Sequence, residues 1–174
     1  MKNEDPNDTT LGNELTWLQG YIDHQLSAYF EPGVESSLPN APALETDISD
    51  LARLFVSEDL DPTHRVIIGL SLATEFKPEA LDLFLTKNAM TERSFTEFGG
   101  DCDPQRSGFM PTAHTAAFLV GARSWSARMA TYRILRPNSP FLERGLVDFR
   151  PSETKSWFSG NLRPSKRILT IIYG

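Results

Sequence analysis

Apolar residues recur at steps of three and four positions through most of the chain, which is the pattern of amphipathic helices. The first such pattern runs from Thr10 to Phe30, where leucines and isoleucines form one stripe and Trp17 and Tyr21 lie on a second flank. Two apolar flanks predict contact with two neighbouring elements. The polar start predicts a disordered leader over residues 1–8, followed by one helical domain over residues 9–174.

Acidic residues and prolines mark the starts of the next helices. Thr46 or Asp47 can cap a short helix. Its inward-facing residues are expected to be Ile48, Leu51, Leu54 and Phe55. Asp61 followed by Pro62 starts a longer helix that is apolar on nearly all sides, so we expect that helix at the centre of the domain. Pro78 starts a further helix.

Several segments do not follow the helical pattern. Residues 31–46 contain three prolines and a glycine and predict a surface linker. Apolar spacing from residue 118 to residue 132 crosses Gly121, so either one helix continues there or two helices meet. Residues 145–162 predict a β-hairpin, and residues 164–174 are equally compatible with a helix and a strand. The sequence therefore predicts a mainly α fold with a small β-hairpin, in the element order of a winged-helix-like helical domain.

Composition and charge narrow the class of protein. The chain has 174 residues, of which 40% are hydrophobic and 23% charged, as in an ordinary globular protein. No apolar run reaches the roughly 18 residues of a membrane span, and the polar start is unlike a signal peptide, so we expect a cytoplasmic protein without membrane contact. With Cys102 as its one cysteine, the chain can form no internal disulfide.

Positive charge is concentrated in the last third of the chain. Residues 1–122 hold 7 Lys and Arg against 20 Asp and Glu, whereas residues 123–174 hold 10 against 3. The two halves can neutralise each other within the fold. Alternatively, the basic third could bind nucleic acid through Arg150, Lys155, Arg163 and residues 165–167, with Trp157 and Phe158 as stacking platforms or as core residues.

The connection from Arg93 to Gly121 is the most unusual segment. A connection this long inside a domain is functional or disordered, and its four phenylalanines argue against disorder. Its paired glycines lack the lysine of a phosphate-binding loop and predict a turn with positive φ. A metal site is conceivable at Glu97, Asp101, Cys102, Asp103 and His114, as is a Cys102–His114 nucleophile pair, but neither has a recognised spacing. We therefore expect no cofactor and no catalytic site.

Three strings in this region resemble a known family. They are LDLFLTKN at residues 81–88, RSFTEFGG at residues 93–100 and GFMPTAHTAAFLVG at residues 108–121. They are similar to the N-terminal region of bacterial AAA-type ATPases, found in Bacteroidetes and beside some contractile injection system clusters. The matching positions are Arg93, Phe95, Glu97, Phe98, Gly99, Gly100, Gly108, Phe109, Pro111, Thr112 and Thr115.

The resemblance implies a non-catalytic, winged-helix-containing domain whose partner is an ATPase core or an injection-system component. It does not imply ATP hydrolysis, because no nucleotide-binding motif occurs up to Gly174. The matching residues also have a structural interpretation. Pro111 and Thr112 can start a helix, the phenylalanines can anchor the loop to the core, and Arg93 can pair with Glu97 or with a carbonyl. The leading hypothesis is a protein-interaction or regulatory domain, followed by nucleic-acid binding and then by an enzyme.

Overall fold

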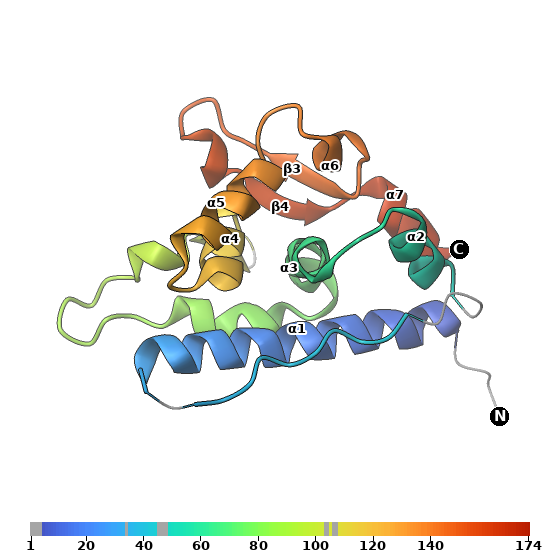
Figure 1. The fold of residues 1–174 in the computed structure, drawn as a ribbon. Helices are drawn as coiled ribbons and strands as arrows, with labels where there is room; N and C mark the ends of the chain where they lie inside the picture. Colours follow the sequence, from blue (N-terminus) through green and yellow to red (C-terminus); the bar gives the residue numbers. More distant parts are fainter. Residues whose placement is uncertain (1–4, 34, 45–48, 103–104, 106–107) are drawn as a thin grey trace.

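The first helix, α1 (Pro6–Phe30), spans the length of the molecule (Figure 1). In the computed structural model, which describes residues 5–33, 35–44, 49–102, 105 and 108–174, Asp5 caps this helix by accepting from the Asn7 amide. The buried Asn7 side chain bonds to Leu51 N and to Ile171 O, which ties the start of α1 to two distant segments. The prediction of a disordered leader is therefore wrong for residues 5–8, and residues 1–4 lie outside the described residues.

Helix α3 (Pro62–Phe76) lies at the centre of the fold, as predicted from its all-round apolar pattern. Figure 1 shows it nearly end-on, between α1 and the pair β3–β4. Asp61 caps it, and Pro62 occupies the first turn. The charged Arg65 is also buried there. Its guanidinium bonds to both carboxylate oxygens of Glu14 on α1 and lies 5.4 Å from the Trp17 ring centroid.

The segment 31–44 contains no helix or strand in its described part and runs back along α1, as expected of a surface linker (Figure 1). It is fixed by two of its carbonyls, since Trp17 Nε1 donates to Pro39 O and Arg65 donates to Pro42 O. The next helix, α2 (Asp50–Ser57), is capped by Ser49 rather than by Thr46 or Asp47. Those two residues and Ile48 lie outside the described part of the chain. The other predicted inward residues, Leu51, Leu54 and Phe55, are buried.

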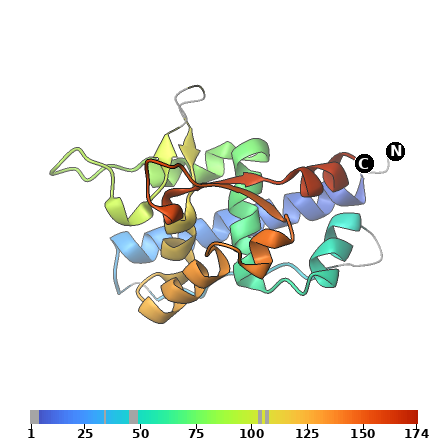
Figure 2. The same ribbon diagram turned by 90° about the horizontal axis from the view of Figure 1, so that it is seen from above.

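The middle of the chain is built from short elements. The segment after Pro78 is the 3-10 helix η1 (Pro78–Leu85), and η2 (Thr96–Phe98) follows. Strands β1 (Asp101–Cys102) and β2 (Phe109–Met110) then form a small antiparallel pair. Figure 2, which views the molecule from above, shows the loop between η1 and η2 projecting beyond the C-terminal end of α1.

Two helices, rather than one continuous helix, cross the region of Gly121. Helix α4 (Ala113–Gly121) ends where Ala122 takes a positive φ of 43°, and α5 (Trp125–Ile134) restarts behind the cap Ser124. A Cβ on Gly121 would lie 2.2 Å from Arg128 Cγ, so the two helices can approach this closely only because residue 121 is glycine. Of the two possibilities that the sequence left open, one continuous helix or two helices that meet near Gly121, the structure shows the second.

The last third contains the predicted hairpin. Helix α6 (Pro140–Glu143) precedes β3 (Val147–Arg150), which pairs antiparallel with β4 (Asn161–Pro164), and the 3-10 helix η3 (Trp157–Ser159) lies between them. The final segment forms α7 (Lys166–Tyr173). Its buried Ile168 and Ile172 lie on one helical face against α1 and α2, and this packing outweighs their preference for strands. The mainly α fold with a small hairpin is thus confirmed.

Candidate functional site

Most of the Arg93–Gly121 residues on which the predicted family resemblance depends hold the segment itself in place. Phe98 is fully buried among the rings of Tyr29, Phe84 and Phe118. Phe109 stacks on Phe84 with ring centroids 4.9 Å apart. The phenylalanines therefore anchor the loop to the core, as the structural interpretation of the sequence expected.

The paired glycines and the threonines shape the turn that leads into α4. Gly99 and Gly100 have φ values of 59° and 81°, and a Cβ on Gly100 would lie 2.1 Å from the Phe109 ring. The amide of Gly100 donates to Thr112 Oγ1 at 3.1 Å, and Thr112 forms a capping box with Thr115. The predicted positive-φ turn and the predicted helix start are both confirmed.

The remaining matching residues have different surroundings. Pro111 O accepts from Leu162 N at 2.8 Å and so joins the loop to β4. A Cβ on Gly108 would meet no atom within 4 Å. Arg93 is exposed, and its predicted ion pair with Glu97 is wrong because Glu97 bonds instead to Arg128 at 3.1 Å. That ion pair links the loop to α5.

An open hollow of about 590 Å³ lies beside this ion pair, where the C-terminal end of α1 meets the α4–α5 corner. We call it the aromatic hollow and define it by the lining residues Tyr29, Glu97, Phe118, Arg123, Trp125 and Arg128. Its walls are mainly apolar, although three of these six side chains are charged. A concave surface of this kind, with few polar groups among aromatic ones, is typical of a binding site.

Arg128 is the most heavily bonded side chain of the aromatic hollow. Its Nε and Nη2 donate to Ala122 O at 2.9 and 2.6 Å, and Nη2 also donates to Glu97. The guanidinium carbon lies 5.7 Å from the Phe118 ring centroid, within cation–π range. Arg128 thus fastens the end of α4 to the start of α5 and to η2, and most of its donors are already used within the chain.

Two other members of the hollow remain available to a ligand. Trp125, in the first turn of α5, is 71% exposed, which is unusual for the largest apolar side chain. Arg123 is exposed and makes no ion pair within the described residues. Tyr29 lies deeper, where burial and, secondarily, the Glu97 carboxylate raise the pKa of its hydroxyl above the usual value. The hollow therefore offers an aromatic edge and one uncompensated positive charge.

Further exposed apolar side chains lie near the hollow. Phe30, at the end of α1, is 42% exposed and packs edge-on against Phe95. Met90, in the projecting loop between η1 and η2, is 94% exposed. Figures 1 and 2 place that loop at the same end of the molecule as the end of α1. Exposed large apolar side chains gathered at one end indicate an interaction surface.

The described residues among those considered for a metal or a nucleophile have other partners or are exposed. Cys102 is exposed, and the partner of His114 Nδ1 is the Tyr132 hydroxyl at 2.8 Å. Burial lowers the pKa of His114 below its ordinary value. Asp101 accepts from Lys155 Nζ at 2.8 Å, and Asp103 lies outside the described residues. Among the residues with described positions, no three His, Cys, Asp or Glu side chains are grouped so as to hold a metal ion.

Three basic residues of the cluster predicted for nucleic-acid binding form ion pairs within the fold. Arg150 pairs with Asp148 on its own strand, and Lys155 pairs with Asp101. Arg167 pairs with Glu58 at 2.5 Å. The two aromatic side chains of this region also pack inward, since Trp157 Nε1 donates to Leu135 O and Phe158 contacts Tyr132. These pairings favour the interpretation that the acidic and basic parts of the chain neutralise each other.

Comparison of the chain with protein-family models, with curated proteins and with solved structures found no match. The resemblance to the N-terminal region of AAA-type ATPases and the winged-helix-like arrangement therefore both stay predictions. Within the described parts of the chain, no helix combines the length and the apolar character needed to cross a bilayer.

Sequence reasoning missed Trp125, Arg123 and Arg128 as members of a site. The helical spacing of Trp125 relative to Phe118 and Tyr132 suggested one shared face of a helix. Because the chain breaks at Ala122, Trp125 instead starts a new helix and is exposed there. The one usable signal was Gly121 followed by Ala-Arg-Ser, a short polar interruption that is compatible with a helix end and a new cap.

Proposed function

We propose that this protein is a non-catalytic interaction domain that binds a partner protein through the aromatic hollow. One observation carries the proposal: Trp125 is exposed at the rim of an open hollow beside the unneutralised Arg123. Tryptophan and arginine are the residues that most often dominate the binding energy of protein interfaces. The family resemblance supports the same conclusion, since the matching residue Glu97 lines the hollow and an ATPase core or injection-system component is the expected partner.

Charge defines the chemistry of the partner. The hollow contains Arg123, Arg128 and Glu97, and Glu97 neutralises Arg128, so one positive charge remains at Arg123. The apolar area of Tyr29, Phe118 and Trp125 can accept an aliphatic or aromatic side chain. The partner is therefore a protein segment that carries an apolar anchor residue close to an Asp or Glu. An acidic residue placed near Arg123 also accelerates association at low salt.

A selection of random displayed peptides on the full chain tests this proposal. We expect the selected sequences to combine an apolar anchor with a neighbouring acidic residue. Trp125→Ala should weaken their affinity by at least about tenfold, because interface tryptophans commonly contribute 2 kcal/mol or more. Val56→Ala is the matched control, since Val56 is an exposed apolar residue on α2 and is not in the hollow. Peptides whose affinity is the same for the Trp125→Ala variant and the unaltered protein would contradict the proposal.

Arg123→Gln tests the charge of the partner separately. We expect it to reduce the affinity of acidic peptides by a few-fold and to remove most of the salt dependence of their association. The same variant should leave unchanged the affinity of a peptide in which the acidic residue is replaced by Gln or Asn. An equal loss for both peptides would show that Arg123 acts through packing and not through charge.

A further inference from the structure

A second hollow, of about 230 Å³, lies where the end of α5, the start of α6 and the first turn of α3 meet. We call it the arginine hollow and define it by the lining residues His64, Arg133, Arg136, Ser139, Phe141 and Arg144. Three guanidinium groups and one imidazole therefore face one small space. None of the residues that line it is Asp or Glu.

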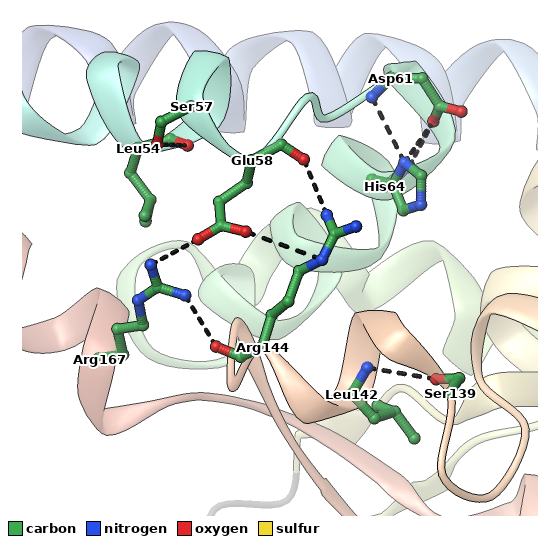
Figure 3. Close-up of polar contacts among 9 residues, drawn as sticks. All are labelled: Leu54, Ser57, Glu58, Asp61, His64, Ser139, Leu142, Arg144 and Arg167. Carbon is green, nitrogen blue, oxygen red and sulfur yellow. Dashed lines mark hydrogen bonds and ion pairs between the residues drawn. The ribbon is translucent and has the colours of Figure 1, made fainter.

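The guanidinium groups are only partly used by the chain. Arg133 is exposed and has no ion pair in the described part of the structure, and Arg136 donates one bond, from Nη1 to Arg133 O at 3.0 Å. Arg144 donates from Nη1 to Glu58 O at 2.8 Å, and its Nε lies 3.7 Å from Glu58 Oε2. In Figure 3 the remaining terminal nitrogen of Arg144 carries no dashed line and is drawn on the side where His64 lies.

The nearby carboxylates do not neutralise this positive charge. Glu58 is shared, because its other oxygen accepts from Arg167 Nη2 at 2.5 Å (Figure 3). Asp61 caps α3 and lies 3.0 Å from His64 Nδ1. Glu143, on α6, lines a different hollow together with Trp157. The four guanidinium groups of Arg167 and the three lining arginines thus outnumber the two carboxylates of Glu58 and Asp61, which leaves two positive charges.

His64 is held in a defined orientation. Its ring stacks on Phe141 with centroids 5.2 Å apart, and its Nδ1 accepts from the Asp61 amide at 3.4 Å (Figure 3). Because Nδ1 is also 3.0 Å from the Asp61 carboxylate, both contacts of the ring with Asp61 are made by Nδ1, and Nε2 can donate to a ligand whenever it carries a proton. The rim is fixed as well, since the Ser139 hydroxyl donates to Ile134 O and accepts from Leu142 N. His64 and the rim at Ser139 are therefore preformed.

We propose that the arginine hollow binds a phosphate monoester group. Forked guanidinium groups recognise phosphate oxygens through paired, charge-assisted hydrogen bonds. Donors from three separate elements, α3, α5 and the residue after α6, suit a tetrahedral group with three free oxygens better than a planar carboxylate, which one arginine can satisfy. The volume admits the phosphate and the first atoms of the group that carries it. This site is separate from the aromatic hollow, and it does not depend on the proposed function.

Titration calorimetry of the full chain at constant ionic strength tests this site, with inorganic phosphate and acetate as the probes. We expect phosphate to bind at least about tenfold more tightly than acetate. The double variant Arg133→Gln/Arg136→Gln should weaken phosphate binding by about tenfold or more, because it removes two charge-assisted donors. Arg123→Gln, an equally exposed arginine of the aromatic hollow, is the control and should bind phosphate as the unaltered protein does.

Several outcomes would overturn the proposal. One is an equal affinity for phosphate and acetate. Another is the absence of phosphate binding at concentrations of about 10 mM, and a third is an unchanged phosphate affinity in the double variant. The variant must also melt at the temperature of the unaltered protein, which we expect because Arg133 and Arg136 are both exposed. A short DNA duplex serves as a further probe. If it binds roughly a hundredfold more tightly than phosphate, with strong salt dependence, the surface recognises nucleic acid instead.

Discussion

Helix α5 contributes to both hollows, one at each end, and the two ends use arginine differently. Arg128 is in the aromatic hollow and Arg133 is in the arginine hollow, only five positions later in the sequence. Arg128 bonds to Ala122 O and Glu97 and lies over Phe118, so it belongs to the structure of the corner. Arg133 has no such partner among the described residues and faces an open space. The number of arginines therefore says little about a binding surface, because only the guanidinium N–H groups that the chain leaves unbonded can donate to a ligand.

The two hollows also differ in what supports them. The aromatic hollow rests on a cluster of rings that includes Tyr29, Phe98 and Phe118, together with a helix corner that depends on Gly121. The arginine hollow rests on hydrogen-bonded caps at Ser139 and Asp61. Changes to the ring cluster should therefore affect folding, whereas changes to the exposed arginines should affect binding only. Four predictions test this difference, beginning with the largest expected effect.

Phe98→Ala should lower the free energy of unfolding by roughly 3–5 kcal/mol, because it opens a cavity beneath the aromatic hollow. Phe98 is 1% exposed and contacts five other rings, those of Tyr29, Phe30, Phe84, Phe95 and Phe118. The matched control is Phe30→Ala, which removes a ring that is 42% exposed and should cost about 1 kcal/mol. Urea unfolding measures both. Because Phe30 is a partly exposed ring of the same cluster, similar costs for the two variants would contradict the expected larger contribution of the buried Phe98.

Gly121→Ala should destabilise the protein by about 1–3 kcal/mol, because the new methyl group forces α4 and α5 apart. It would lie 2.2 Å from Arg128 Cγ and 2.7 Å from the Arg128 amide nitrogen. Gly12→Ala on α1 is the control. Its methyl group would meet no atom within 4 Å, so a gain of about 0.5–1 kcal/mol from helix propensity is expected. Thermal unfolding that ranked the two variants in the opposite order would contradict this account of the corner.

Arg128→Ala and Arg133→Ala compare the two arginines directly. The first variant removes the donors to Ala122 O and Glu97, so we expect it to cost about 1–2 kcal/mol. The free energy of unfolding of the second variant should stay within about 0.5 kcal/mol of that of the unaltered protein, since the Arg133 side chain is exposed and unbonded in the described structure. The denaturant midpoints of the two variants, measured under the same conditions, test this prediction. Equal effects would remove the distinction between a structural and an available arginine.

The smallest expected effect concerns pH and the contact between α4 and α5 behind the corner. Because burial lowers the pKa of His114 below its ordinary value of 6.5, the unfolded chain takes up a proton at a higher pH than the folded chain does. Above pH 6.5, His114 is neutral in both states, and its burial does not lower the free energy of unfolding. As the pH falls through and below 6.5, the unfolded chain binds the proton first, and the free energy of unfolding decreases. His114→Gln should remove this part of the pH dependence, and His24→Gln should retain it. Unfolding curves from pH 8 to pH 5 measure the slope, and equal slopes in unaltered protein and His114→Gln would contradict the assignment.

Local sequence signals predicted much of the fold. The Asp61-Pro62 pair predicted the start of α3, and the Pro111-Thr112 pair predicted that of α4, where the structure shows Thr112 in a capping box with Thr115. In each case the interacting atoms lie within four residues of one another, so the sequence displays both partners together. The same is true of the glycine pair at residues 99 and 100, whose turn followed from the absence of side chains.

The candidate sites were less accessible to sequence reasoning. The loop from Arg93 to Gly121 was identified as distinctive, and its Glu97 and Phe118 do line the aromatic hollow. The arginine hollow was missed because the turn between α5 and α6 brings the arginines of residues 133–144 around one space, and His64 joins them from α3. The pairing of Lys155 within the predicted basic cluster was not accessible for a related reason, since its partner Asp101 lies 54 positions away.

By itself, the sequence determined the helical class, the central position of α3 and the turn that enters α4, because these depend on periodicity and on neighbours along the chain. Only the tertiary structure decided which charges remain available. Glu97 bonds to Arg128 across 31 positions, and Glu58 bonds to Arg167 across 109. Such pairs form only when packing brings distant segments together, and they determine whether an arginine stabilises the fold or remains free to bind a ligand.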